Sequence, residues 1–287
     1  LHIPYQLHQL EHTSLFVDGT DSFLQSLLQL GGFGKWVALF GTQLFAFWGI
    51  ASWVFILPVL ILFVVTAYLL PIIRSYALPV ASWGAVSLLL SMFDYNNGWV
   101  GAVSLSLSFC VLLIISFLRM LITRTIVFLV SLPCIAWLFG PVVWVYLICG
   151  ICLLTNEKNY KLLLFTSVGI VALMFVVIHS LGMIGTFQQV MSPIFYYDIM
   201  NEFPLHHWIP WSIWALVFVG SRIVHFDSVR HKVLHWTMYS CAWLLPCVLL
   251  VSYAPKLTNK QMQVLYRLNH YSYTENWDSI LRVLSGI

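Results

Sequence analysis

Residues 99–118 read WVGAVSLSLSFCVLLIISFL and carry no charged side chain. A segment of this length and composition can cross the hydrocarbon core of a bilayer as one α-helix. Its small residues Gly101, Ser104, Ser106 and Ser108 predict close packing against neighbouring helices rather than a conduction path. The similar stretch SWGAVSLLLS at 82–91 supports the same interpretation. These two segments predict an all-α membrane bundle.

The composition of the whole chain agrees with a polytopic membrane protein. Hydrophobic residues make up 61% of the 287 positions and charged residues 8%, whereas soluble domains are about 45–50% apolar. The net charge of +3 is spread over many loops without a basic tract, which excludes a nucleic-acid partner. The six cysteines all lie in apolar runs, including Cys149-Gly-Ile-Cys152, and are expected to pack as small hydrophobic residues.

About eight visible spans are predicted within the transmembrane bundle, which we place at 48–254. The fourth and fifth of them are short, and Leu138-Phe139-Gly140-Pro141 between them is either a kink in one long helix or a tight turn between two helices. The predicted spans are 48–71, 77–92, 99–118, 125–138, 141–154, 161–183, 208–224 and 233–253.

The distribution of charge favours the turn. With two separate spans, Lys35 lies on one face, and the other eight basic residues before the tail share the opposite face, which the positive-inside rule makes cytoplasmic. Most acidic residues then lie outside, and residues 1–47 form an extracytoplasmic loop, so we expect one more span before residue 1. The eight basic residues are Arg74, Arg119, Arg124, Lys158, Lys161, Arg222, Arg230 and Lys232.

The first loop contains QLEHTSLFVDGTDSFLQSLLQLGG at residues 9–32. Asp21 is a predicted N-cap, apolar residues follow at helical spacing, and Gly31-Gly32 supplies a C-terminal stop. A helix of this length cannot span, so it is expected to lie in the interface, with its Leu/Phe face in lipid or against the bundle. A second helix at 33–47 leads into the first span.

Glu11 is the candidate catalytic base. It precedes the interfacial helix and follows directly on the expected missing span, so it would lie at the membrane surface. The neighbouring His12 is a candidate for substrate binding. A solvated surface glutamate is the alternative interpretation of Glu11.

The outer loop at 184–208 carries the candidate metal site. Asp198, Glu202 and His206 are spaced four apart, which would place them on one helical face suited to a hard divalent cation. His206 and His207 are also candidates for substrate binding. However, Pro204 interrupts the helix, and a hydrated loop with an aromatic interface belt is the alternative.

The loop FDYNNG at 93–98 and the C-terminal tail are the remaining polar segments. Asp94 and Asn97 would lie on the outer face as further substrate-binding candidates, although Asn-Asn-Gly is also ordinary turn sequence. Residues 255–287 predict an extracytoplasmic helical hairpin similar to the start of a tetratricopeptide array. One such pair cannot bury its own apolar face, so either further repeats or a protein partner would cover it.

The order of these features resembles an uncharacterised family of multi-spanning inner-membrane proteins of Bacteroidota with a helical-repeat tail. The motifs that carry the resemblance are Leu15-Phe16, Leu30-Gly31-Gly32, Gln43 and LNHYSYTENWDSIL in the tail. The resemblance implies a multi-pass protein of the bacterial inner membrane, and it implies no activity.

A wider likeness is to membrane glycosyltransferases of the C-type superfamily, which have interfacial helices in a large first loop and an acidic residue just after the first span. Glu11 matches the position of that acidic residue. The likeness implies transfer of a sugar from a polyprenyl phosphate at the outer face. The alternative is a non-enzymatic scaffold of an envelope assembly or secretion complex, contacted through the C-terminal hairpin.

Overall fold

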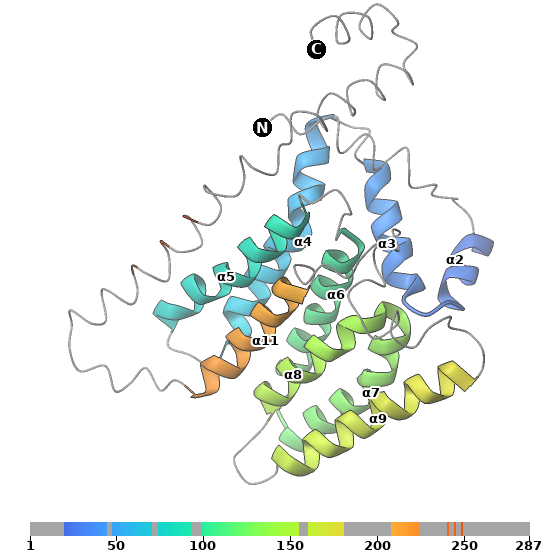
Figure 1. Cartoon of the computed structure of the whole chain (residues 1–287), viewed down its shortest axis with the longest axis vertical. Helices are drawn as coiled ribbons and strands as arrows, with labels where there is room; N and C mark the ends of the chain where they lie inside the picture. Colours follow the sequence, from blue (N-terminus) through green and yellow to red (C-terminus); the bar gives the residue numbers. More distant parts are fainter. Residues whose placement is uncertain are drawn as a thin grey trace, which may run out of the picture.

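The computed structural model describes residues 20–44, 48–70, 74–92, 99–154, 160–180 and 208–223, together with Ser240, Leu244 and Val248. All regular elements in these ranges are helical, which confirms the all-α class for the described part of the chain (Figure 1). They are α2 (Thr20–Leu27), α3 (Gly32–Gln43), α4 (Trp48–Leu69), α5 (Arg74–Met92), α6 (Trp99–Ser116), α7 (Leu121–Phe139), the 3-10 turn η2 (Gly140–Val142), α8 (Val143–Leu154), α9 (Tyr160–Ser180) and α11 (Trp208–Ile223).

Helix α6 occupies the centre of the bundle. It packs against α3, α4, α7 and α8 (Figure 1), and its small residues Gly101, Ser104, Ser106 and Ser108 are all buried. The hydroxyl of Ser106 donates to the Val103 carbonyl at 2.8 Å, and that of Ser108 donates to the Ser104 carbonyl at 2.7 Å. Because these hydroxyls bond within their own helix, α6 can bury them. The prediction of close packing by this helix is confirmed.

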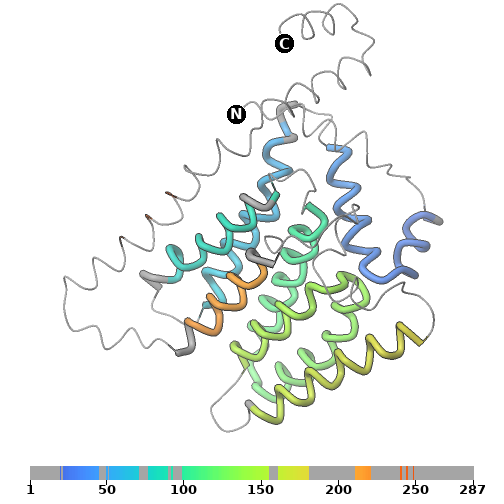
Figure 2. The backbone as a smooth tube through the Cα atoms, viewed as in Figure 1, coloured from blue at the N-terminus to red at the C-terminus, as the bar shows by residue number. Residues whose placement is uncertain are grey.

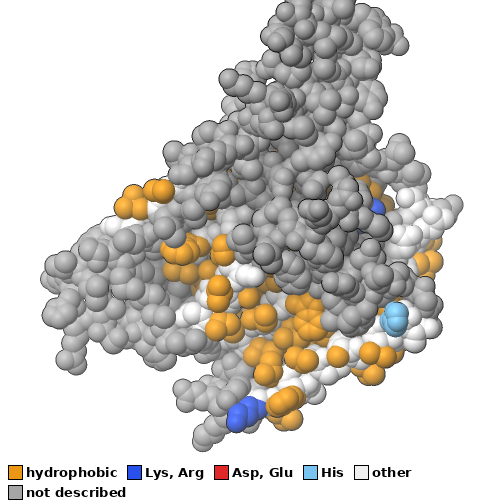
Figure 3. All heavy atoms as spheres, in the orientation of Figure 1, with side chains coloured by type: hydrophobic (Ala, Val, Ile, Leu, Met, Phe, Trp, Pro, Cys, Tyr) orange, Lys and Arg blue, Asp and Glu red, His pale blue; other side chains and the backbone are white. Residues whose placement is uncertain are grey.

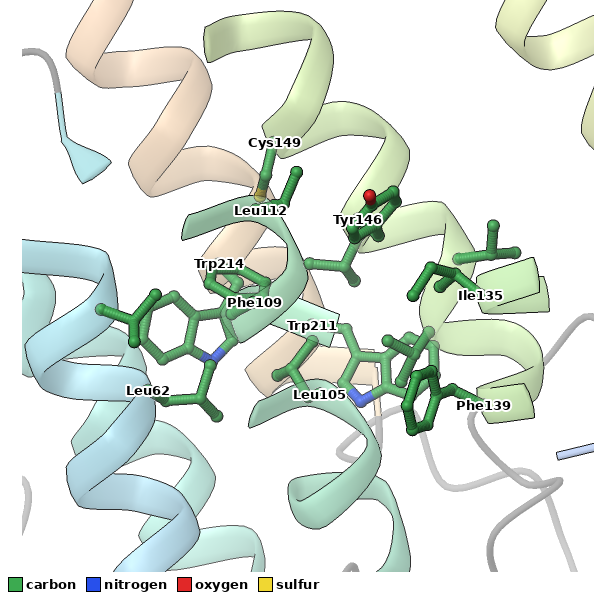
Figure 4. Close-up of a cluster of buried hydrophobic side chains, with 14 of the residues drawn as sticks. Leu62, Leu105, Phe109, Leu112, Ile135, Phe139, Tyr146, Cys149, Trp211 and Trp214 are labelled. Carbon is green, nitrogen blue, oxygen red and sulfur yellow. The ribbon is translucent and has the colours of Figure 1, made fainter. Parts of the chain in front are cut away.

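Helices α4, α5 and α11 pack on one side of α6. Phe55 stacks on Trp99 at 5.8 Å and Tyr68 contacts Phe117 at 5.7 Å, so α4 runs parallel to α6. Helix α11 lies between α5 and α8, and it inserts Trp214 into the core (Figure 4).

Trp214 is fully buried because Gly84 of α5 leaves room for it. A Cβ on Gly84 would lie 2.6 Å from the indole ring. On its other side the indole meets Phe109 of α6 edge-on at 5.6 Å. Figure 4 shows these rings among Leu62 and Leu105. This side of the core is therefore filled by aromatic side chains that fit over a glycine.

Helices α7 and α8 form an antiparallel hairpin. The Ser131 and Tyr146 hydroxyls lie 2.5 Å apart, and Phe128 stacks on Tyr146 at 5.5 Å. In one continuous helix, Ser131 and Tyr146 would be separated by about 22 Å. The chain reverses at Gly140, whose φ of 70° is a conformation that glycine adopts readily. Of the two predicted possibilities, the structure has the tight turn.

Helix α9 lies on the outside of this hairpin. Its Phe175 stacks on Trp144 of α8 at 6.0 Å, while Leu162, Phe165 and Leu173 are exposed. Similar exposed apolar stripes run along α4 and α7. The described part of the surface in Figure 3 is accordingly dominated by hydrophobic side chains. Contiguous apolar surface of this extent is typical of contact with lipid.

Helices occur at seven of the eight predicted spans. In the eighth, 233–253, the structure describes only Ser240, Leu244 and Val248, each of them helical and exposed. By length and composition, four stretches of the described chain can cross a membrane: Ser52–Leu69, Trp99–Ser116, Leu121–Leu154 and Lys161–Ser180. The third includes the whole α7–α8 hairpin, and α5 and α11 contain shorter apolar segments. The total of about eight spans therefore stays a prediction.

The close approach of α7 and α8 makes Gly150 a sensitive position. A Cβ there would lie 2.6 Å from Cζ of Phe128, whose ring is fully buried against Tyr146. We expect Gly150→Ala to lower the free energy of unfolding by about 1–3 kcal/mol through overpacking, measured as thermal or denaturant unfolding in detergent micelles.

The matched control is Gly169→Ala in α9, where a Cβ would meet nothing within 4 Å. Because alanine favours a helix over glycine by about 1 kcal/mol, this variant should be neutral or slightly more stable. Equal loss of stability in both variants would contradict the tight α7–α8 contact.

Candidate functional site

The residues proposed from sequence as site residues all lie outside the described part of the chain. Their roles as a catalytic base, substrate ligands and metal ligands therefore stay predictions. They are Glu11, His12, Asp94, Asn97, Asp198, Glu202, His206 and His207. Among the residues that are described, no group of three or more His, Cys, Asp or Glu side chains could hold a metal ion.

The most specific polar arrangement that the structure describes is the corner between α2 and α3, hereafter the α2–α3 corner (Thr20–Gln43). Asp21 lies within helix α2 (Thr20–Leu27), and the residue before it, Thr20, is already helical, so Asp21 does not occupy the predicted N-cap position. The helix stops before Gly31, which has a φ of 67°. The predicted glycine stop is confirmed, because only glycine takes this left-handed conformation without a steric cost.

Two hydrogen bonds attach the α2–α3 corner to the end of α7. The Gly31 N–H donates to the Trp137 carbonyl at 2.7 Å, and the Trp137 indole N–H donates to the Leu27 carbonyl at 2.8 Å. Both acceptors lie in the last turn of a helix, where carbonyls have no partner within the helix. The corner and α7 therefore satisfy each other's terminal carbonyl groups.

Aromatic rings extend this attachment. Phe33 contacts Phe139 of α7 at 5.7 Å, and Phe23 contacts Phe33 at 6.5 Å and Trp36 at 5.0 Å. Trp36 in turn stacks on Phe40 at 6.0 Å. Edge-to-face and offset aromatic contacts of this kind stabilise packing beyond the area that they bury. The series of rings fixes the angle between α2 and α3.

Helix α3 approaches α6 through small residues. A Cβ on Gly34 would fall on Ser104 Oγ, and one on Gly41 would lie 3.1 Å from the Trp99 ring. The Trp99 indole N–H donates to the Ala38 carbonyl at 3.0 Å. Ser104 Oγ is buried without a hydrogen-bond partner in the described part of the chain, and it occupies the space that a side chain on residue 34 would need.

These contacts also fix the depth of the α2–α3 corner. Helix α3 runs antiparallel to α6, with Gly34 beside Ser104 and Gly41 beside Trp99. Ser104 is five residues into α6, which is about 8 Å along the axis. Figure 2 traces the chain through the corner into α3. The Gly31 end of α3 therefore lies beside α6 about 8 Å along the α6 axis from Trp99, in the direction of Ser116.

The apolar face of α2 is divided between two environments. Phe23 packs on α3, whereas Leu24 and Leu28 are 56% and 71% exposed, and Phe40 of α3 is 50% exposed. Phe23 is thus packed against protein, whereas contact of Leu24 and Leu28 with lipid stays a prediction. Exposed Leu and Phe at this depth are suited to contact hydrocarbon chains of lipids.

Sequence reasoning did not identify Trp137, Trp99 or Ser104 as partners of the first loop. The Cys149-Gly-Ile-Cys152 spacing, by contrast, was interpreted as packing. Cys149 is fully buried in the core and Cys152 packs against it. That interpretation is confirmed.

The apolar helices, the exposed apolar stripes and the inserted α2–α3 corner define a helical membrane protein. The chain belongs to the DUF6057 family, a family of unknown function whose model matches residues 1–286. No curated protein matches the chain, and no solved structure does. The resemblance to a family without an assigned function is thus confirmed, while the bacterial group and the helical-repeat tail stay predictions.

The attachment of the α2–α3 corner can be tested at Trp137. In Trp137→Phe the Leu27 carbonyl loses its indole donor, and we expect a cost of about 1 kcal/mol. The corner should then open more often, and trypsin should cleave after Lys35 several-fold faster, because proteolysis follows local opening. Cleavage is measured on detergent-solubilised protein by mass spectrometry.

Trp53→Phe provides the control. It makes the same chemical change away from the corner, at a residue of α4 that is 71% exposed. It should leave cleavage after Lys35 unchanged. If Trp137→Phe behaves like Trp53→Phe, the indole hydrogen bond to the Leu27 carbonyl does not hold the corner in place.

Proposed function

We propose that this membrane protein is a glycosyltransferase that uses a polyprenyl-phosphate-linked sugar at the end of the bundle that carries the α2–α3 corner. We further propose a bacterial inner-membrane location, with this end extracytoplasmic. The observation that supports the proposal is the inserted corner itself. It exposes Leu24, Leu28 and Phe40 at a depth where an isoprenoid chain would lie.

Glu11 is within reach of this surface. It precedes Thr20 by nine residues, and nine residues in extended conformation cover at most about 30 Å. A carboxylate carried on this segment can lie above a lipid that rests against the corner. The head group of such a lipid would be at the membrane surface and its chain would be alongside α2.

The proposed reaction is a displacement at the anomeric carbon. The Glu11 carboxylate accepts the proton of an acceptor hydroxyl, and the hydroxyl oxygen forms a bond to the anomeric carbon. The bond from that carbon to the phosphate oxygen breaks, and polyprenyl phosphate leaves with the electron pair.

The other predicted site residues are assigned supporting roles in the proposal. A divalent cation held by Asp198, Glu202 and His206 would neutralise charge on the leaving phosphate. Four further residues are proposed to bind the substrates: His12, Asp94, Asn97 and His207.

Glu11→Gln tests the proposed chemistry. Membranes containing the variant should lose sugar transfer from an added polyprenyl-phosphate sugar by at least about 100-fold, since general bases contribute about 10²–10⁴-fold. The variant should still retain polyprenyl phosphate on purification, as measured by native mass spectrometry. Asp18→Asn, a neighbouring acid in the same segment, is the control and should retain activity. Full activity of Glu11→Gln would remove Glu11 from the mechanism.

The alternative function is a scaffold in an envelope complex. The filled core supports a role at the surface of the bundle rather than transport through the described part of it, since Leu62, Leu105, Phe109 and Trp214 occupy its centre (Figure 4). The proposed contact is the predicted hairpin at 255–287, which lies outside the described residues. A protein partner would cover its apolar face.

Deleting Lys256–Ile287 distinguishes this alternative from the enzyme. For a scaffold, the shortened protein should stay in the membrane and lose its stoichiometric partner subunits, measured by gentle extraction and native mass spectrometry. For the transferase, the Glu11→Gln variant loses turnover and keeps all of its partners. A complex that is unchanged by the deletion would count against the scaffold.

A further inference from the structure

The turn between α6 and α7 carries an exposed cation beside exposed hydrophobic residues. Arg119 is exposed, and Phe117, Met120, Leu121 and Ile122 around it are 63%, 71%, 50% and 75% exposed. Four large exposed apolar side chains on this turn and the first residues of α7 are unfavourable in water. This combination fits the boundary between lipid chains and head groups, where arginine extends its charged end to the phosphate layer.

The conformation of this turn is held by Arg124. The Nε–H of Arg124 donates to the Leu118 carbonyl, which lies just beyond the end of α6. A cation at the C-terminus of a helix also interacts favourably with the helix dipole. Arg124 therefore closes the turn, while Arg119 at its tip faces outward.

Lys161 of α9 lies at the same end of the bundle as Arg119. The contacts of the α7–α8 hairpin show this, because they relate positions along the axes of α7 and α9. Tyr146 lies beside Ser131, so Trp144, two residues earlier on the antiparallel α8, is level with Pro133 of α7. Trp144 also stacks on Phe175 of α9. Pro133 and Phe175 are therefore at about the same height.

The positions of the two cations follow from counting residues back toward the start of α9 from Phe175 and toward the start of α7 from Pro133. Lys161 is fourteen residues before Phe175, and Arg119 is fourteen residues before Pro133. Lys161 therefore lies about 21 Å from that common level, and Leu121 at the start of α7 lies about 18 Å from it on the same side, so that Arg119, in the turn just before α7, is at the same end as Lys161. Lys161 is exposed and, like Arg119, has exposed apolar neighbours, Leu162 and Phe165. We call this end of the molecule, with Arg119, Arg124 and Lys161, the basic end.

We propose that the basic end binds the phosphate groups of anionic phospholipids through Arg119 and Lys161. Charge complementarity selects the partner, because guanidinium and ammonium groups form charge-assisted hydrogen bonds with phosphate oxygens. The exposed apolar residues around both cations place those phosphates at the rim of a lipid layer. Each cation close to an anionic lipid surface contributes about fivefold to binding.

The test uses full-length protein in detergent, titrated with phosphatidylglycerol or with phosphatidylcholine and followed by native mass spectrometry. Arg119→Gln and Lys161→Gln should each reduce the preference for phosphatidylglycerol about fivefold, and the double variant should reduce it about 25-fold. Arg119→Lys and Lys161→Arg keep the charge and should keep most of the preference. Thermal unfolding confirms that each variant remains folded.

Lys35→Gln is the matched control, because Lys35 is exposed on α3 in the α2–α3 corner, at the opposite end of α7. It removes the same charge and should leave the preference unchanged. An equal loss in Lys35→Gln would show a non-specific effect of net charge and would overturn the proposal. Displacement of phosphatidylglycerol by equimolar inorganic phosphate would also overturn it, because the site would then take a soluble anion.

The same experiment also tests whether the basic end binds an acidic protein instead of a lipid. If the double variant binds phosphatidylglycerol as the unchanged protein does, yet loses a co-purifying acidic protein, the basic end is a protein interface and not a lipid site. Loss of phosphatidylglycerol with unchanged protein composition supports the lipid.

Discussion

The close approach of helices to α6 is the constraint on which the other contacts of this bundle depend. Helices within a bilayer gain little from leaving lipid for each other, so their association relies on van der Waals packing between small residues. Helix α6 presents Gly101, Ala102 and three serines, all buried. Larger side chains there would hold α3 and α4 away, and the indole of Trp99 would not reach the Ala38 carbonyl. The α2–α3 corner depends on the same approach.

Among the described residues, exposed cations lie toward the two ends of the bundle, whereas its interior is mostly apolar. The buried serines of α6 at positions 106 and 108 donate to carbonyls of their own helix, and aromatic rings fill the space between α6 and α11. Arg119, Arg124 and Lys161 mark one end, while the α2–α3 corner occupies the other. A substrate or lipid would therefore meet this protein at its surfaces.

The sequence is sufficient to predict where the helices lie, because a run of apolar residues must satisfy its backbone hydrogen bonds internally in a membrane. It also predicts the stop at Gly31, since glycine adopts a positive φ without steric cost. The same reasoning leaves the Gly140-Pro141 segment undecided, because both a kink and a turn are compatible with these residues. The hydroxyl pair of Ser131 and Tyr146 shows the turn.

The partners of the α2–α3 corner could not be predicted for a different physical reason. In a soluble helix the buried face is recognised by its hydrophobicity, but in a membrane helix both the lipid-facing and the core-facing sides are apolar. Nothing in the sequence of α7 therefore distinguishes Trp137 as the residue that meets Leu27 and Gly31. Glu11 and the other predicted site residues lie in segments outside the described structure, so the sequence alone supports their roles.

The two ends of α7 together set the depth of the corner in a bilayer. Arg124 is tied to the end of α6, and Trp137 is tied to the corner, thirteen residues or about 20 Å away. A hydrocarbon core is about 30 Å thick. If the basic end lies at one head-group layer, the corner lies about 10 Å short of the other, in agreement with its depth beside α6. Leu24 and Leu28 then face lipid chains, and any polar reaction must use residues that lie above them.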